Sequence, residues 1–256
     1  MYDRVLDGRE LTFGVSGKLW KNVLIMYDRQ TGSLWSHLTG EAVVGSLTGK
    51  RLKTYPAAML TWGEWLKLRP ATLVLEKPGG GRGMRDPYED YYYSARTGIL
   101  PEKHRDNRLH PKTWVIGLVV GNPSGRGEAS AKAYPFPELD RTGVLNDRFE
   151  DRDLAVTYCK EARSGAVFDR RLDGKVLTFA PDAAPPGADS APGEGASCRF
   201  MRDKETGSRW QRLTGQAVEG PMRGKRLVQL PTTQAFWFGW KDYYPKSEVF
   251  SRQSTK

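Results

Sequence analysis

The chain has 256 residues, of which 38% are hydrophobic and 11% aromatic, enough apolar material for a sizeable buried core. Its net charge is +10, but the basic residues are dispersed and no aromatic-rich recognition motif accompanies them, which disfavours nucleic-acid binding. No apolar run approaches the roughly 20 residues of a transmembrane helix, the N-terminus lacks a signal-peptide pattern, and two cysteines are too few for a disulfide framework or a metal site.

The first half predicts a hairpin followed by short helices. Residues 22–28 and 33–38 form two strand-like runs joined by a turn in which Asp28 can accept backbone hydrogen bonds and Gly32 can adopt a positive φ. A short helix is predicted after Thr61, a good N-cap residue, and it ends before Pro70. A second short helix is predicted after Asp86.

The second half predicts strands almost throughout. Short β-branched or aromatic runs are separated by Gly, Asp or Asn at a spacing of about 8 to 12 residues, which is typical of sandwiches and barrels. These runs are 114–120, 132–136, 153–159, 166–172 and 175–179. The sequence therefore predicts an all-β fold with a few short helices.

The hairpin turn occurs twice. "MYDRQTGSLWSHLTG" (26–40) is repeated as "MRDKETGSRWQRLTG" (201–215), 175 positions later. "YDRVLDGRELTF" (2–13) reappears as "FDRRLDGKVLTF" (168–179), at an offset that is shorter by nine. We infer a tandem duplication whose halves form barrel- or sandwich-like units about a pseudo-two-fold axis.

The repeat also sets the expected domain boundaries. Residues 1–76 form the first repeat, 77–112 a basic connector rich in Gly, Pro and Tyr, and 113–256 the second repeat. Residues 180–197, rich in Pro, Ala and Gly, are expected to be a disordered insertion. Since residues 113–167 have no counterpart before Met1, the first repeat is expected to be incomplete at its N-terminus.

Two familiar interpretations of the repeated turn fail. A two-lobed aspartic protease needs a pair of carboxylates that share a proton, but Gln30 and Glu205 occupy the required position and Gln30 cannot titrate. A β-propeller repeats every 40 to 50 residues, whereas the two copies here are 175 residues apart.

We therefore expect a noncatalytic binding or scaffold module with a ligand or partner near the interface of the repeats, where pockets commonly form. The expected ligand-binding residues are those of the two turns: Asp28, Ser33, Trp35, Asp203, Ser208 and Trp210. No metal or cofactor is expected. Self-association through unpaired strand edges stays open.

Cys159 is the only catalytic candidate, and a weak one. It lies in a predicted strand, where a buried inert thiol is favoured over a nucleophile. A disulfide with Cys198 stays open. His37 lies beside the first turn, but its counterpart is Arg212, so a solvent-facing side chain is favoured over a general base.

The chain resembles the bacterial family catalogued as domain of unknown function 3179. The resemblance rests on "YDRVLDGRELTFGVSGKLW", "LIMYDRQTGSLWSHLTGEAVVG", "LTWGEWLKLRP", "AKAYPF", "VLND" and "AVFDR". It implies a bacterial or archaeal protein, often exported, with no established activity.

The resemblance also bears on the cysteines. It implies a Cys-x-x-Cys pair before the first repeat block, but here the chain begins after that point, and the second repeat has Cys159 with Ala162 in place of the second cysteine. A metal or redox site needs both thiols, which argues against catalysis. The alternative is a hydrolase or thiol-dependent enzyme whose key residues lie partly in the absent N-terminal segment.

Overall fold

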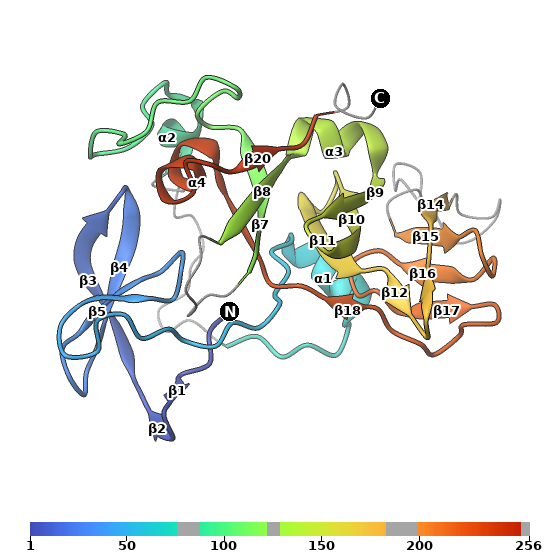
Figure 1. The fold of residues 1–256 in the computed structure, drawn as a ribbon, viewed down its shortest axis with the longest axis horizontal. Coiled ribbons are helices and arrows are strands. Elements are labelled where there is room, and N and C mark those ends of the chain that lie inside the picture. The colour runs from blue at the N-terminus through green and yellow to red at the C-terminus, as the bar shows by residue number, and fades with distance from the viewer. Residues whose placement is uncertain (76–87, 122–128, 183–198, 252–256) are drawn as a thin grey trace.

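The computed structural model describes residues 1–75, 88–121, 129–182 and 199–251. Within these ranges the fold consists mostly of strands, arranged in four four-stranded sheets and two two-stranded ribbons. Short helices lie between them (Figure 1). No described sheet closes into a barrel, so the all-β prediction is confirmed in its sandwich-like form.

The first repeat contributes one ribbon and one antiparallel sheet. The ribbon pairs β1 (Val5–Leu6) with β2 (Arg9–Glu10). The first-repeat sheet has the order β3 (Phe13–Trp20), β4 (Val23–Asp28), β5 (Leu34–Ser36) and β6 (Ala42–Val44). The β4–β5 hairpin pairs Met26 with Trp35, as the sequence predicts. One face of the sheet buries a small core of Leu11, Trp35, Ala42 and Leu52.

The second repeat contains the same ribbon and sheet. The ribbon is β12 (Arg171–Leu172) with β13 (Lys175–Val176). The second-repeat sheet has the order β14 (Phe179–Asp182), β15 (Phe200–Asp203), β16 (Arg209–Gln211) and β17 (Ala217–Glu219). Its core includes Leu177, Trp210, Ala217 and Leu227, the counterparts of the first-repeat core.

One boundary of the expected insertion is wrong. Residues 180–182 belong to β14, where Pro181 pairs with Met201. A proline is tolerated there because β14 is the edge strand of its sheet and need not donate a hydrogen bond on its outer side. The rest of the expected insertion, residues 183–197, lies outside the described residues.

The second half adds two further sheets. The central sheet has the order β18 (Val228–Gln229), β11 (Ser164–Asp169), β10 (Arg152–Cys159) and β9 (Val144–Phe149). The outer sheet has the order β19 (Thr232–Phe236), β7 (Trp114–Val120), β8 (Ser130–Pro135) and β20 (Glu248–Val249), with β20 parallel to β8.

These sheets stack because the central sheet is apolar on both faces. In β10, Leu154 and Val156 pack against Ile116 and Tyr134 of the outer sheet. Ala155, between them, faces the core of the second-repeat sheet. A strand that is buried on both sides reads as a continuous apolar run, which is what residues 153–159 show.

The short helices are partly predictable. Helix α1 (Trp62–Leu68) is confirmed, with the Thr61 hydroxyl accepting from the Glu64 amide at 3.4 Å. Helix α2 (Glu89–Tyr93) lies after Asp86, as expected. Helices α3 (Phe136–Thr142) and α4 (Trp237–Tyr243) were not predicted. The strand expected over 132–136 ends at Pro135, because Pro137 favours the first turn of α3 and Gly143, at φ 65°, ends that helix.

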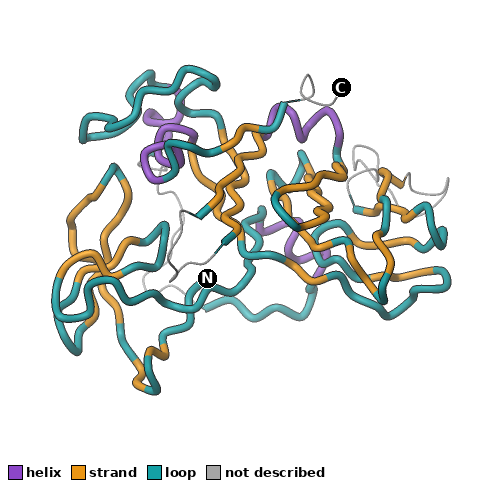
Figure 2. Tube along the Cα trace, in the orientation of Figure 1, coloured by secondary structure: helices purple, strands orange, loops and turns teal. Residues whose placement is uncertain are grey.

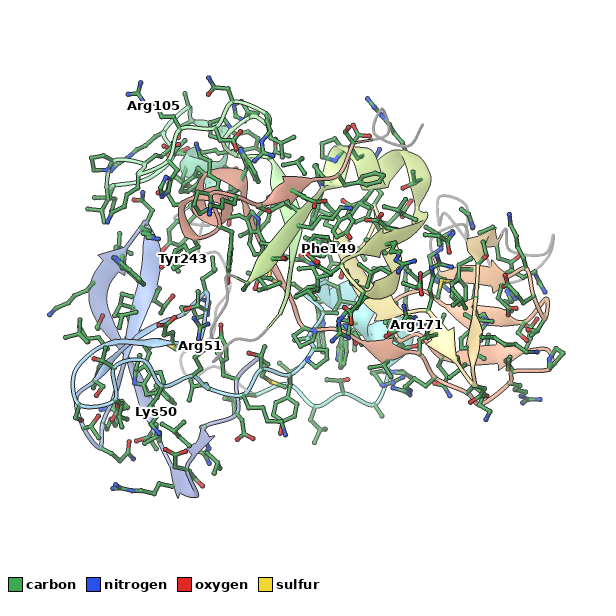
Figure 3. All side chains as sticks on the ribbon, in the orientation of Figure 1. Lys50, Arg51, Arg105, Phe149, Arg171 and Tyr243 are labelled. Atoms are coloured by element: carbon green, nitrogen blue, oxygen red, sulfur yellow. The ribbon has the colours of Figure 1, made fainter. Side chains whose placement is uncertain are left out.

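Helix α4 joins the two halves. Figure 3 shows Tyr243 between α4 and the first-repeat sheet, where its hydroxyl donates to the Trp20 carbonyl at 2.9 Å. The Lys21 ammonium donates to the Asp242 carbonyl at 2.8 Å. The connector is held to the same helix, because the buried Asp242 carboxylate accepts from the amides of Lys103 and His104. None of the described helices has the length and hydropathy of a membrane span.

A glycine under α4 allows this packing. A Cβ at Gly117 in β7 would lie 2.2 Å from the Trp240 ring. We therefore predict that Gly117→Ala lowers the free energy of unfolding by about 1–3 kcal/mol through overpacking. Gly239→Ala in α4 is the matched control, because its Cβ would meet nothing within 4 Å, and it should be neutral or stabilising by up to about 1 kcal/mol. Urea unfolding measures the free energy of unfolding of both variants. Equal changes in the two variants would contradict the close contact between Gly117 and Trp240.

Candidate functional site

The turn of the first repeat is organised by a buried carboxylate. Asp28 Oδ1 accepts from the Thr31 amide at 2.6 Å, and Oδ2 accepts from the Trp35 indole N–H at 2.9 Å. The hydroxyls of Thr31 and Ser33 lie 2.7 Å apart. Asp28, Ser33 and Trp35 have no exposed surface. Every one of these contacts lies within the turn or between the turn and its own strand.

The turn of the second repeat has the same geometry. Asp203 accepts from the Thr206 amide at 2.6 Å and from the Trp210 indole at 2.8 Å. The Thr206 and Ser208 hydroxyls are again 2.7 Å apart. Asp203 is 1% exposed, and Ser208 and Trp210 are fully buried. The duplicated sequence therefore encodes a duplicated hydrogen-bond network.

A glycine completes each network. Gly45 and Gly220 both have a positive φ, and a Cβ on either would lie 2.8 Å from the Cα of the turn serine, Ser33 or Ser208. That serine hydroxyl also accepts a backbone amide from the following loop, that of Leu47 or Met222. The loop after each sheet is thereby fixed against the turn.

The electrostatics of the first turn favour an ionised carboxylate. Burial alone raises the pKa of Asp28, but hydrogen bonds from Trp35, Thr31 and Ser33 outweigh it and hold the pKa below its ordinary value of 3.8. The negative charge is thus stabilised by fixed donors of the protein itself. This arrangement closes a turn, and it leaves the carboxylate without an exposed edge for a ligand.

The six residues expected to bind a ligand are therefore turn and core residues in this structure. They lie in two sheets at opposite ends of the long axis of the molecule (Figure 1), so they do not meet at an interface between the repeats. Their burial gives no support to direct ligand contact. The repeated residues form the hydrogen-bond network of each turn, and ligand binding by them stays a prediction.

Cys159, the weak catalytic candidate, is buried and disulfide-bonded, so of the two states that the sequence left open the structure has the bridged one. The other cysteine of the chain, Cys198, lies outside the described residues. A sulfur in a disulfide is not a thiolate nucleophile. His37 is exposed, as expected, and its pKa lies below the ordinary value because the surrounding protein partly desolvates the ring and the charged N-terminus repels its protonated form. Among the described residues, no group of three or more His, Cys, Asp or Glu side chains is placed to hold a metal ion.

The structure instead places a cleft between the repeats, which we call the junction cleft. It has a volume of about 560 Å³. The first repeat contributes residues 59–61, and the connector contributes α2 and Lys112. The outer sheet, α3 and the β10–β11 turn supply the remaining walls. Its lining residues are Met59, Leu60, Thr61, Tyr92, Tyr93, Lys112, Trp114, Phe136, Ala162, Arg163, Gln234 and Phe236.

Aromatic rings form the main wall of the junction cleft. The ring centroids of Trp114 and Phe236 are 4.3 Å apart, because these residues are paired across β7 and β19. Phe136 stacks on Trp114 at 6.2 Å and packs on Tyr158 at 4.8 Å. The three rings of the wall, at 114, 136 and 236, are half-buried. They present a preformed apolar surface to the cleft.

Two cations lie on the rim. The Lys112 ammonium sits 3.9 Å from the Tyr91 ring and donates to the carbonyls of Tyr91 and Ser94, so its hydrogen bonds hold α2 against the cleft. Arg163 is exposed at a positive φ of 48°, in the turn between β10 and β11. Leu60 packs beside that turn against Cys159 and Ala162, and the Thr61 amide donates to the Ala162 carbonyl at 3.4 Å.

The sequence interpretation missed these residues because it searched for what the repeats share. Phe236 corresponds to Thr61 in the first repeat, in the same extended conformation before a helix. Trp114, Phe136 and Arg163 lie in or beside the segment that has no counterpart in the first repeat. These residues could have been found in the sequence by aligning the two repeats and looking for aromatic and charged residues that only the second repeat has.

The comparisons with known proteins agree with the duplication. A family model described as "Protein of unknown function (DUF3179)" matches twice in tandem, over residues 1–126 and 126–256. No curated protein and no solved structure matches the chain.

The first turn gives a prediction about stability. Asp28→Asn removes the charge that the indole and amide donors stabilise, and it should lower the free energy of unfolding at neutral pH by about 1–3 kcal/mol. Since the folded-state pKa lies below 3.8, this stabilisation is present above pH 3.8 and is lost as the pH falls through the folded value. When the pH is lowered from neutral to below 3.8, the free energy of unfolding should therefore fall less for the variant than for the parent chain. Urea unfolding of both proteins at each pH measures this difference.

Asp7→Asn is the control for this experiment. Asp7 pairs with Lys50 at the surface, where its side chain is 66% exposed, and its positive φ of 49° suits asparagine. Its effect should stay within about 0.5 kcal/mol. A parent-like stability of Asp28→Asn at neutral pH would contradict the structural role of the turn.

Proposed function

The chain belongs to the DUF3179 family, whose function is unknown, and from this premise we propose that it is a noncatalytic binding module whose ligand occupies the junction cleft. The observation that carries the proposal is the wall of half-buried rings at 114, 136 and 236, which lies between two repeats and is open to solvent. A contiguous apolar surface that stays open to solvent on a folded protein often marks a binding site. A concave aromatic surface with a few polar groups is the usual composition of a ligand site.

The composition of the cleft indicates the ligand class. Rings favour a planar apolar body, and the volume of about 560 Å³ suits a small molecule. Arg163 at the rim offers a guanidinium that pairs with a carboxylate in a bidentate manner, and Gln234 adds an amide. A planar aromatic carboxylate satisfies all three features.

The lining supports binding over catalysis. The described residues that line the cleft include no carboxylate, imidazole or thiol, which are the groups that most often serve as general acids, bases and nucleophiles. The Lys112 ammonium is engaged with backbone carbonyls.

The disulfide bears on the compartment. Because structural disulfides persist in oxidising environments, the bonded Cys159 supports the exported location that the family resemblance implies. This argument concerns the compartment in which the module acts and does not bear on which ligand it binds.

The test is a calorimetric titration of the chain with 2-naphthoate, a planar bicyclic carboxylate. Arg163→Asn should weaken binding by about three- to tenfold, because it removes a charged hydrogen-bond donor. Asparagine tolerates the left-handed backbone at this position. The uncharged analogue 2-naphthamide should bind the parent chain and the variant equally.

Arg9→Asn is the control, because Arg9 is exposed on the β1–β2 ribbon and does not line the cleft. It should leave naphthoate affinity unchanged. Naphthoate binding that is insensitive to Arg163→Asn, or that weakens equally in the Arg9 variant, would contradict the assignment of the ligand to this cleft.

A further inference from the structure

The first-repeat sheet has a pocket on the face opposite its core. Side chains alternate between the two faces of a strand, and Trp35 of β5 points into the core, so Leu34 points to the other side, which we call the back face. A pocket of about 420 Å³, the back-face pocket, is lined by residues of β3, β4, β5 and β6. These strands form the sheet at the left of Figure 2. The volume is in the range of small-molecule sites.

Aliphatic side chains and one indole ring line the back-face pocket. Ile25 is 3% exposed, Leu34 is half-buried and Val44 is 56% exposed. The Trp20 ring also lines the pocket, and it packs edge-on against Tyr243 of α4 with the ring centroids 5.5 Å apart. The position of this wall is therefore fixed by the other half of the chain. A preformed apolar surface lowers the cost of ordering groups when a ligand binds.

The second repeat has a charged side chain in the same place. Arg209 is the counterpart of Leu34, and Glu219 is the counterpart of Val44. The Arg209 guanidinium lies 4.0 Å from the centre of the Phe200 ring and pairs with the Glu219 carboxylate at 3.2 Å. Arg209 is only 7% exposed. The back face of the second-repeat sheet is thus occupied by an ion pair of the sheet itself, where the first repeat has a pocket.

The central sheet packs on the opposite face from this ion pair. Ala155 and Ala166 of the central sheet belong to the same apolar cluster as Trp210. Arg209 precedes Trp210 in β16 and therefore points away from that cluster. The back face is thus not the surface that the central sheet covers. The two back faces differ because of side chains in strands that both repeats have.

The rim of the back-face pocket carries an available positive charge. Lys18 lines the pocket and is exposed, and in the described part of the chain no carboxylate pairs with its ammonium. Glu41, the carboxylate among the described lining residues, is neutralised by an ion pair with Arg51. The pocket therefore combines an apolar interior with a net positive rim, which is complementary to an apolar anion.

We propose that the back-face pocket binds a straight-chain aliphatic carboxylate of the fatty-acid class. The alkyl chain contacts Ile25, Leu34 and Val44, where burial of its methylene groups supplies the affinity, and the carboxylate meets the Lys18 ammonium at the rim. Lys18 is exposed, so its contribution is small and consists mainly of a preference for an anion over a neutral analogue. The pocket shares no lining residue with the junction cleft, and this inference does not rest on the ligand proposed for that cleft.

The test is a calorimetric titration of the full chain with hexanoate, octanoate and decanoate, each below its micelle concentration. Affinity should rise by about threefold for each added methylene group, because each one buries a similar apolar area. The double variant Leu34→Arg/Val44→Glu introduces the ion pair that the second repeat has at this place. It should weaken decanoate binding by about tenfold or more, because the two new side chains occupy the pocket and remove apolar contacts equivalent to two or more methylene groups.

A matched control introduces the same charges elsewhere in the first repeat. Val15→Arg/Val5→Glu changes residues that are 70% and 48% exposed and do not line the pocket. It should leave decanoate affinity unchanged. The Leu34→Arg/Val44→Glu variant should keep the affinity of the parent chain for 2-naphthoate, so a failure of the junction-cleft proposal is separate from a failure of this one.

A second variant tests the rim without disturbing the apolar lining. Lys18→Met should weaken decanoate binding by about two- to fivefold and leave the affinity for 1-decanol unchanged, because the alcohol has no charge to pair. The Lys18 side chain is exposed, so this variant should fold like the parent chain, which thermal unfolding checks.

Three results would overturn the proposal. They are the absence of decanoate binding at millimolar concentration, an affinity that does not depend on chain length, and decanoate binding that survives Leu34→Arg/Val44→Glu in a folded protein. Equal weakening by the double variant and by its matched control would also overturn it, because the effect would then not come from the back-face pocket.

Discussion

The structure depends on a hydrogen bond between a buried aspartate and a buried tryptophan, made once in each repeat. The Asp28–Trp35 and Asp203–Trp210 bonds measure 2.9 and 2.8 Å. A charge and an indole N–H cannot both be buried unless they satisfy each other and their neighbours. The turn must therefore close in one way, which fixes the hairpin register and places the tryptophan in the core. Retention of one turn chemistry in both copies follows from this constraint.

Since both repeats have the same interior, their differences lie in what covers it. The second repeat stacks α4, the outer sheet and the central sheet over its own sheet. The first repeat ends in α1, whose tryptophans stay exposed. The junction cleft opens where these two arrangements meet, with residues 59–61 on one side and the aromatic wall on the other. Both proposals thus concern surfaces that the duplication left unequal.

Much of the fold could be predicted from the sequence. Strand 114–120 and the hairpin around Asp28 were predicted because periodicity and turn chemistry are local signals. Helix α4 was missed because its residues are buried on nearly all sides, so they show no amphipathic pattern, although alignment with α1 would have found it. The candidate site was not predicted. Conserved spacing between repeats indicated Asp28 and Trp35, but such spacing marks packing as readily as function, and only burial separates the two.

The most direct test of this account is a crystal structure of the chain soaked with a panel of planar aromatic carboxylates. The account predicts ligand density in the junction cleft, with the ring against Trp114 and Phe236 and the carboxylate toward Arg163. The two Asp–Trp hydrogen bonds should be unchanged in the same crystal. Density at either repeated turn, with a carboxylate or ring displacing Asp28 from Trp35 or Asp203 from Trp210, would contradict it.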